Sequence, residues 1–165
     1  MKKVLVIIDV QKGFISEHTK GLATRIKKFV EKNHKKYSLI LFTQHINNNK
    51  SYLYRNLGWK GFMKEEEYGL MDEIAELAKS KKVFIKDTYG AFVNKKIESL
   101  LKNKGIKEVH LAGIDTENCV LTFARDAFDR GFNVVVFKNL CRSHSNPSLH
   151  KAALEIIKDN IGEVR

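Results

Sequence analysis

VLVIID, residues 4–9, is a run of five apolar residues followed directly by an acid. A short run without polar alternation is typical of a strand buried on both faces of a parallel sheet. Four later runs share this pattern and are predicted as strands, at residues 38–43, 82–86, 109–113 and 133–137, with a last short strand at 163–165. The sequence therefore predicts a mainly parallel sheet covered by helices.

Segments with helical periodicity separate these strands, because their apolar residues recur three and four positions apart. Gly105 and Gly131 follow two of the segments, at the position where helices commonly end. Pro147 begins the last one, after Ser145 or Asn146 as its cap. The predicted helices are residues 22–36, 70–79, 91–104, 116–130 and 147–160. This alternation predicts an α/β fold with a doubly wound sheet and right-handed crossovers.

Length and composition favour a single domain, residues 1–165. Hydrophobic residues make up 43% of the chain, and no segment has the composition of a linker. No apolar run approaches the ~20 residues of a membrane span. The run at 4–8 is shorter than the roughly 7–15 apolar residues of a signal peptide. We therefore expect a cytoplasmic protein without a membrane partner.

The formal charge is +11, which raises the question of a nucleic-acid partner. The lysines are dispersed over positions where helices face water, and no aromatic residues are interleaved with them as single-strand binding requires. A solvated lysine-rich surface is the favoured interpretation, so we do not expect nucleic-acid binding.

Three residues with catalytic potential follow predicted strands. Ligands of doubly wound sheets bind beyond the carboxyl ends of the strands, where Asp9, Lys86 and Cys119 are expected to meet. Nucleophile, base and a charge-orienting group together suit covalent catalysis. Taken singly, each has a structural alternative: a helix-capping acid, a strand-end lysine at the surface and a buried cysteine.

Cys119 falls in the first turn of the helix predicted at 116–130, with Thr116 as N-cap and Glu117 suited to the helix dipole. A helix N-terminus stabilises negative charge, so we expect a lowered thiol pKa and backbone amides directed at an oxyanion. Cys119 and Cys141 have no CxxC or metal-finger spacing, and both are expected to be free thiols.

Residues 45–68 form a long irregular segment that contains Trp59, the only tryptophan. Such a segment is either a binding loop or a loop whose aromatic residues only pack it onto the domain. Arg142 and His144, beyond the fifth strand, either contact a substrate carboxylate or cap a loop. The candidates for lining a substrate pocket are Gln11, Phe14, Gln44, Trp59 and Tyr89.

Three segments resemble the isochorismatase-like cysteine hydrolases, which include nicotinamidases, isochorismatases and N-carbamoyl amidohydrolases. These are DVQKGF at 9–14, KDTYGAF at 86–92 and GIDTENCV at 113–120, the last continuing to Gly131. They occur in the family's order and spacing over almost the whole chain. Three linked motifs are far more specific than a single short pattern.

The resemblance implies a three-layer α/β/α sandwich, commonly oligomeric, with a catalytic triad of Asp9, Lys86 and Cys119. It also implies a cis peptide between Ile114 and Asp115, with the amides of Asp115 and Cys119 facing the oxyanion. The expected reaction is hydrolysis of a small amide or carbamoyl compound through a Cys119 thioester. We accordingly expect a small-molecule substrate and a homo-oligomer, a dimer or larger.

Two departures from the family pattern concern specificity. Nicotinamidases have a metal-binding Asp-x-His pair after the second strand, but here residues 43–47 are TQHIN and only His45 lies nearby. A lone histidine is a poor metal site, so no metal or other cofactor is expected and the nicotinamidase interpretation is weakened. Gly90 stands where many members have serine.

Two other functions remain open at this point. A non-catalytic basic α/β module that binds nucleic acid or a protein partner is the alternative from another class. A nicotinamidase or an isochorismatase proper is the second enzymatic alternative. True isochorismatases do not use the cysteine chemistry, so Cys119 argues against that activity.

Overall fold

The computed structural model describes all 165 residues and contains one six-stranded sheet. Its strand order is β3-β2-β1-β4-β5-β6, and every neighbouring pair is parallel. The strands are β1 (Lys3–Ile8), β2 (Leu39–His45), β3 (Lys82–Lys86), β4 (Glu108–Ile114), β5 (Asn133–Arg142) and β6 (Glu163–Val164). The predicted doubly wound parallel sheet is confirmed.

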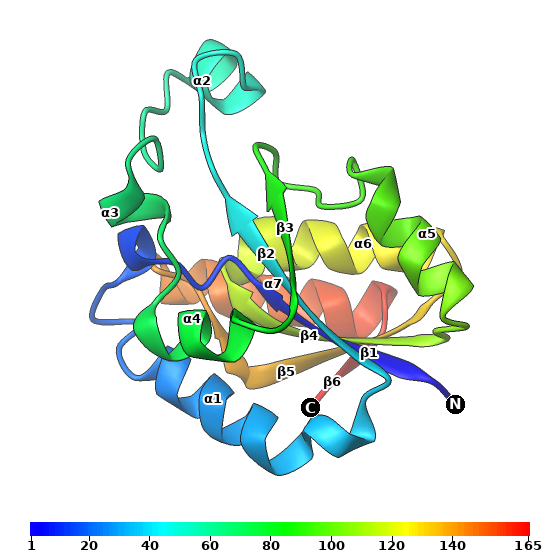
Figure 1. Cartoon of the computed structure of the whole chain (residues 1–165). Helices are drawn as coiled ribbons and strands as arrows, with labels where there is room; N and C mark the ends of the chain where they lie inside the picture. The colour runs from blue at the N-terminus through cyan, green and yellow to red at the C-terminus, as the bar shows by residue number, and fades with distance from the viewer.

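Helices cover both faces of the sheet (Figure 1). They are α1 (Leu22–Asn33), α2 (Tyr52–Leu57), α3 (Glu65–Tyr68), α4 (Asp72–Ala78), α5 (Lys95–Asn103), α6 (Leu121–Asp129) and α7 (Pro147–Asn160). Alternate residues of β1 point to opposite faces. Leu5 and Ile7 belong to the buried cluster that includes residues of α1 and α4, whereas Val4 and Val6 belong to the cluster with residues of α5, α6 and α7. Each cluster joins one face of the sheet to the helices that cover it, so the helices and the sheet form a three-layer α/β/α sandwich.

Several boundaries differ from the sequence expectations. Segment 45–68, expected to be irregular, contains the short helices α2 and α3. Strand β5 extends to Arg142 because the β4–β5 register shifts between Leu111 and Gly113, which lets the two strands pair again at Ile114. The helix expected at 91–104 begins at Lys95, where the Asn94 side chain accepts a hydrogen bond from the Lys96 amide.

The chain winds from β1 outward to β3 and then returns to the centre of the sheet at β4. The point where its winding direction reverses therefore lies between β1 and β4. Ligand sites of such sheets lie at this point, beyond the carboxyl ends of the strands. The two strands pair in register from Lys3 with Glu108 to Ile8 with Gly113. Asp9 and the turn that follows Ile114 therefore emerge side by side.

No helix of the structure combines the length and the apolar character that crossing a membrane would require.

Candidate active site

The structure brings Asp9, Lys86 and Cys119 together at the carboxyl edge of the sheet. The Lys86 Nζ lies 2.7 Å from Asp9 Oδ2 and 3.3 Å from Cys119 Sγ. It also donates a hydrogen bond to the Thr88 carbonyl at 2.8 Å. The three side chains are buried, with residue exposures of 0%, 8% and 6% respectively. A buried ammonium thus contacts both a carboxylate and a thiol.

Asp9 is fixed by the strand beside it. Its backbone has a positive φ of 49°, and it follows directly on β1. Thr43 of β2 donates a hydrogen bond from Oγ1 to Asp9 Oδ1 at 2.6 Å. Thr43 was not among the residues predicted from the sequence to belong to the site. The signal that could have found it is the parallel register, in which Thr43 pairs with Ile8, the residue before Asp9.

Electrostatics at the thiol differ from the sequence expectation. Burial raises the pKa of Cys119, the neighbouring Asp9 carboxylate raises it further, and Lys86 acts in the opposite direction. The expectation of a lowered thiol pKa is wrong because it considered only the helix N-terminus and not the burial of the sulfur. For Lys86, burial would lower the pKa, but the neighbouring Asp9 carboxylate outweighs it and the pKa is raised. The resting state therefore holds a neutral thiol beside a charged lysine.

The turn that presents Cys119 is a π-helical turn, Thr116–Val120, followed by α6. The peptide bond between Ile114 and Asp115 is cis. Thr116 is not the N-cap expected from the sequence, because its Oγ1 is hydrogen-bonded to His150 Nδ1 at 2.7 Å. The backbone cap position belongs to Asp115, whose carbonyl accepts hydrogen bonds from the amides of Asn118 and Val120.

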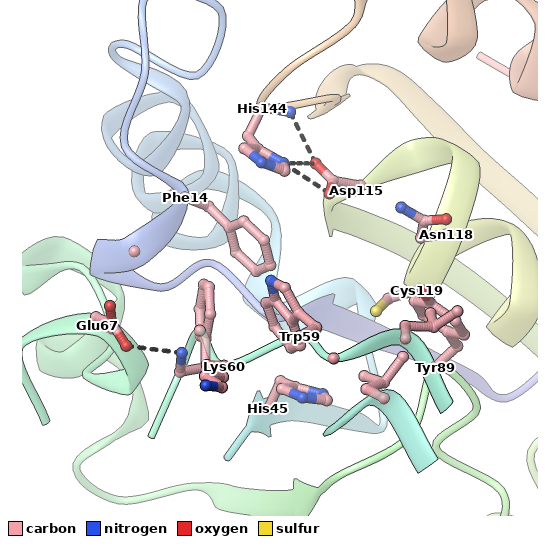
Figure 2. A pocket seen from close by; sticks show the side chains of 16 residues that line it. Phe14, His45, Trp59, Lys60, Glu67, Tyr89, Asp115, Asn118, Cys119 and His144 are labelled. Carbon is pink, nitrogen blue, oxygen red and sulfur yellow. Dashed lines mark hydrogen bonds and ion pairs between the residues drawn. The ribbon is translucent and has the colours of Figure 1, made fainter. Parts of the chain in front are cut away.

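A cavity of about 640 Å³ opens beside Cys119 (Figure 2). Phe14, Trp59 and Tyr89, three of the predicted pocket residues, line it. Phe62 completes the aromatic wall, with ring centroids 4.3 Å from Phe14 and 5.4 Å from Trp59. The cavity is therefore large enough for a small molecule and mostly apolar, with the thiol among its lining groups.

Gln11 and Gln44 do not line this cavity. Gln11 is fully buried, and its amide donates hydrogen bonds to the carbonyls of His45 and Tyr68 and accepts one from the His45 amide. Gln44 donates to the same Tyr68 carbonyl at 2.9 Å. Their polar groups are thus used to attach β2 to the segment around Tyr68.

The segment at 45–68 contributes directly to the cavity, through Trp59, Phe62 and several neighbours. The Asn47 amide donates to the carbonyls of Trp59 and Gly61 at 2.9 and 3.0 Å. These bonds hold the segment over the cavity, which favours the binding-loop interpretation of this segment. Lys60 and Asn118 also line the cavity but were not predicted from the sequence. For Asn118, the available signal was its position directly before Cys119.

Arg142 and His144, both expected beyond the fifth strand, differ in the structure: Arg142 is the last residue of β5 and His144 follows the strand. Arg142 directs its guanidinium to the carbonyls of Lys138 and Cys141, at 2.9 and 2.7 Å. It does not line the cavity, whereas His144 does.

His45 lies on the cavity wall with 3% exposure, and its ring packs against Trp59 at 5.4 Å. Its Nε2 has no hydrogen-bond partner. No group of three His, Cys, Asp or Glu side chains is placed to share a metal ion. The residues around His45 therefore do not fit a metal site of three or four protein ligands.

Burial, together with the charge of Lys86, lowers the pKa of His45 to about 4. A base with a lowered folded-state pKa binds more protons when unfolded, so its contribution to stability is lost as pH falls below about 6.5. We expect the unfolding free energy of the wild type to fall by roughly 3 kcal/mol more than that of His45→Phe between pH 7 and pH 4.

Urea denaturation at both pH values measures this difference. His18 is exposed and provides the matched control, since His18→Gln should behave as the wild type does. Identical pH dependence in the wild type and His45→Phe would show that His45 is not buried as a neutral ring.

Comparison with known proteins places the chain in a family. The family model described as the isochorismatase domain matches residues 3–165. With the fold and the cysteine site described above, this shows that the chain belongs to the isochorismatase family of hydrolases.

Individual relatives match part or all of the chain. It is 40% identical over 77 residues to the uncharacterized isochorismatase family protein PncA of Bacillus subtilis, covering 47% of this chain and 42% of that protein. It is 30% identical over 99 residues to ureidoacrylate amidohydrolase RutB of Acinetobacter baylyi, covering 59% and 40%. The chain thus aligns with less than half the length of these curated relatives.

Solved structures match over their full length. The crystal structure of nicotinamidase PncA from Bacillus subtilis superposes with a TM-score of 0.88 at 26% identity, covering 99% of both chains. N-carbamoylsarcosine amidase from Thermoplasma acidophilum gives a TM-score of 0.85 at 20% identity, covering 100% of this chain and 96% of that one. The second match concerns the fold alone.

Proposed function

We propose that this protein is a cysteine hydrolase that cleaves a C–N bond of a small amide or carbamoyl compound through a Cys119 thioester. The observation that carries the proposal is Lys86, whose Nζ contacts both Asp9 Oδ2 and Cys119 Sγ at the edge of the cavity. Relatives named as nicotinamidase and ureidoacrylate amidohydrolase support this class of reaction.

The reaction begins with a proton transfer, because the resting thiol is neutral. Asp9 takes the proton as the Cys119 sulfur attacks the carbonyl carbon, and Lys86 stabilises the charges that result. The amides of Asp115 and Cys119 stabilise the oxyanion of the tetrahedral intermediate. Asp9 then gives its proton to the leaving nitrogen, and ammonia or an amine departs. Water, deprotonated by Asp9, attacks the thioester, releases the acid and restores the thiol.

Nicotinamidase activity is a second candidate within this class, and a specific observation favours it. The aromatic wall of Phe14, Trp59 and Phe62 suits a planar ring, and the matched Bacillus subtilis structure is a nicotinamidase. The lack of a metal-ligand cluster distinguishes this site from the pattern that family resemblance implies for nicotinamidases. The non-catalytic binding module is not favoured, since a nucleophile, a base and a lysine converge at a cavity.

Ammonia release from nicotinamide, ureidoacrylate and N-carbamoylsarcosine tests the proposal. We expect turnover of at least one compound, and a loss of about a hundredfold or more in kcat for Asp9→Asn. Asp72→Asn, which removes an exposed carboxylate paired with Lys12, is the matched control and should retain wild-type kcat. No turnover of any compound, or an unimpaired Asp9→Asn, would contradict the proposal.

We also propose that the protein forms a homo-oligomer. Strand β3 is an edge of the sheet, and Ile85 on it is 59% exposed, while nearby in sequence Val93 is 72% exposed. Light scattering at micromolar concentration should give at least twice the mass of one chain. A monomeric mass would contradict this expectation.

A further inference from the structure

His144 is the one histidine of the cavity wall that is held by a carboxylate. Its Nδ1 lies 2.9 and 2.8 Å from Asp115 Oδ1 and Oδ2, and its backbone amide donates to Oδ1 at 2.7 Å. On the other side, Ser16 Oγ donates to the His144 carbonyl at 2.6 Å, and the ring packs against Phe14 with centroids 5.0 Å apart. Ring and backbone are therefore both fixed in orientation.

The contact with Asp115 determines the tautomer of the neutral ring. An ionised carboxylate only accepts hydrogen bonds, so the proton of the neutral imidazole resides on Nδ1. Nε2 is then a hydrogen-bond acceptor, and it makes no hydrogen bond within the protein. The side chain is 38% exposed and lines the cavity. An oriented acceptor is thus available to a ligand inside a mostly apolar cavity.

Two other titratable side chains of the wall, Glu67 and His45, are less suited to this role. The Glu67 carboxylate accepts the Phe62 amide at 2.7 Å. His45 is almost fully buried, and no carboxylate sets its tautomer. Figure 2 shows the His144 ring on the cavity wall apart from the Cys119 sulfur, with Asp115 beside the ring. A ligand whose carbonyl lies at the sulfur would reach His144 with a different part of its structure.

We propose that His144, oriented by Asp115, binds the substrate by accepting a hydrogen bond from an N–H or O–H group remote from the scissile carbonyl. The inference rests on the proposed function, and it narrows the substrate class. Amides with a second donor, such as a ureido N–H, an amine or a hydroxyl, are preferred over amides whose remote end has only acceptors. Removal of a single hydrogen bond of this kind typically weakens binding about three- to tenfold.

Protection of Cys119 from iodoacetamide measures this preference without requiring turnover. The ligands are benzamide, nicotinamide and 3-aminobenzamide, which share a six-membered ring and a carboxamide. Benzamide has no further polar group, nicotinamide has a hydrogen-bond acceptor in its ring, and 3-aminobenzamide has a hydrogen-bond donor on its ring. Peptide mass spectrometry follows the alkylation rate of Cys119, normalised for each variant to its rate without ligand. In the wild type, 3-aminobenzamide should protect at a concentration about three- to tenfold lower than the other two.

His144→Phe keeps a ring against Phe14 but removes the acceptor, so the preference for 3-aminobenzamide should disappear. His144→Leu serves the same purpose should the phenylalanine variant not fold. His150→Phe is the matched control. His150 is hydrogen-bonded to Thr116, in the turn that presents Cys119, but it does not line the cavity. It should retain the preference.

Three results would overturn the inference. In the wild type, the three ligands could protect equally or not protect at all. In the variants, the preference for 3-aminobenzamide could survive removal of the His144 imidazole. The expected preference in protection, without hydrolysis of any amide, would support the binding role of His144 and count against the proposed reaction. Failure of the inference and failure of the proposed function therefore give different results.

Discussion

Cys119→Ala is expected to lower kcat/KM for the best amide substrate by at least about a thousandfold, because Cys119 carries the only thiol that lines the cavity and Lys86 contacts both this thiol and Asp9. The fold should persist, since the substitution removes only one buried sulfur atom. Steady-state ammonia release, together with a thermal unfolding curve, measures both effects. Full activity in a folded Cys119→Ala variant would eliminate the thioester route.

Cys141→Ala is the matched control for this experiment. Cys141 is also a free, fully buried thiol, and burial raises its pKa to about 12. Its Sγ contacts the Leu111 carbonyl at 3.9 Å and is absent from the cavity wall. The variant should therefore keep activity within a few-fold of the wild type. Equal losses in both variants would indicate general disruption of packing and not loss of a nucleophile.

Gly113→Ala is expected to cause the largest loss of stability among single-methyl additions. Gly113 ends the register between β1 and β4 with φ of +140°, and a Cβ there would lie 2.1 Å from the Ile8 carbonyl oxygen. Backbone atoms of two central strands would have to separate. We expect a loss of about 3 kcal/mol or more in the free energy of unfolding, measured by urea denaturation.

Gly131→Ala separates the clash from the backbone conformation. Gly131 also has a positive φ, of +80°, but a Cβ there would meet nothing within 4 Å. Only the left-handed conformation is then unfavourable, at about 1 kcal/mol. Equal losses in the two variants would show that close approach of β1 and β4 is not what requires glycine at position 113.

The sequence predicted the sheet well because its central strands are buried on both faces. Runs such as residues 4–8 and 133–137 have the length and the β-branched composition of buried strands, and segments with helical periodicity separate them. The positions of Asp9, Lys86 and Cys119 could be anticipated for the same reason, since the ends of parallel strands meet at one edge. Family membership and the α/β fold are confirmed by the comparisons and the structure.

Features that depend on contacts distant in the sequence could not be predicted. The extension of β5 follows from a register shift against β4. The buried hydrogen bonds of Gln11 depend on where the chain around Tyr68 returns. The direction of the Cys119 pKa shift follows from burial and from Asp9, which the position of the cysteine in a helix does not reveal.

The thioester intermediate is tested most directly by partitioning with hydroxylamine. An amide and the methyl ester of the same acid would be hydrolysed in the presence of hydroxylamine, and the ratio of hydroxamate to acid measured for each. If both pass through the same Cys119 acyl-enzyme, the ratio is identical for the two leaving groups, which is the predicted result. A ratio that depends on the leaving group would mean that water and hydroxylamine attack the substrate itself, and would contradict the covalent mechanism.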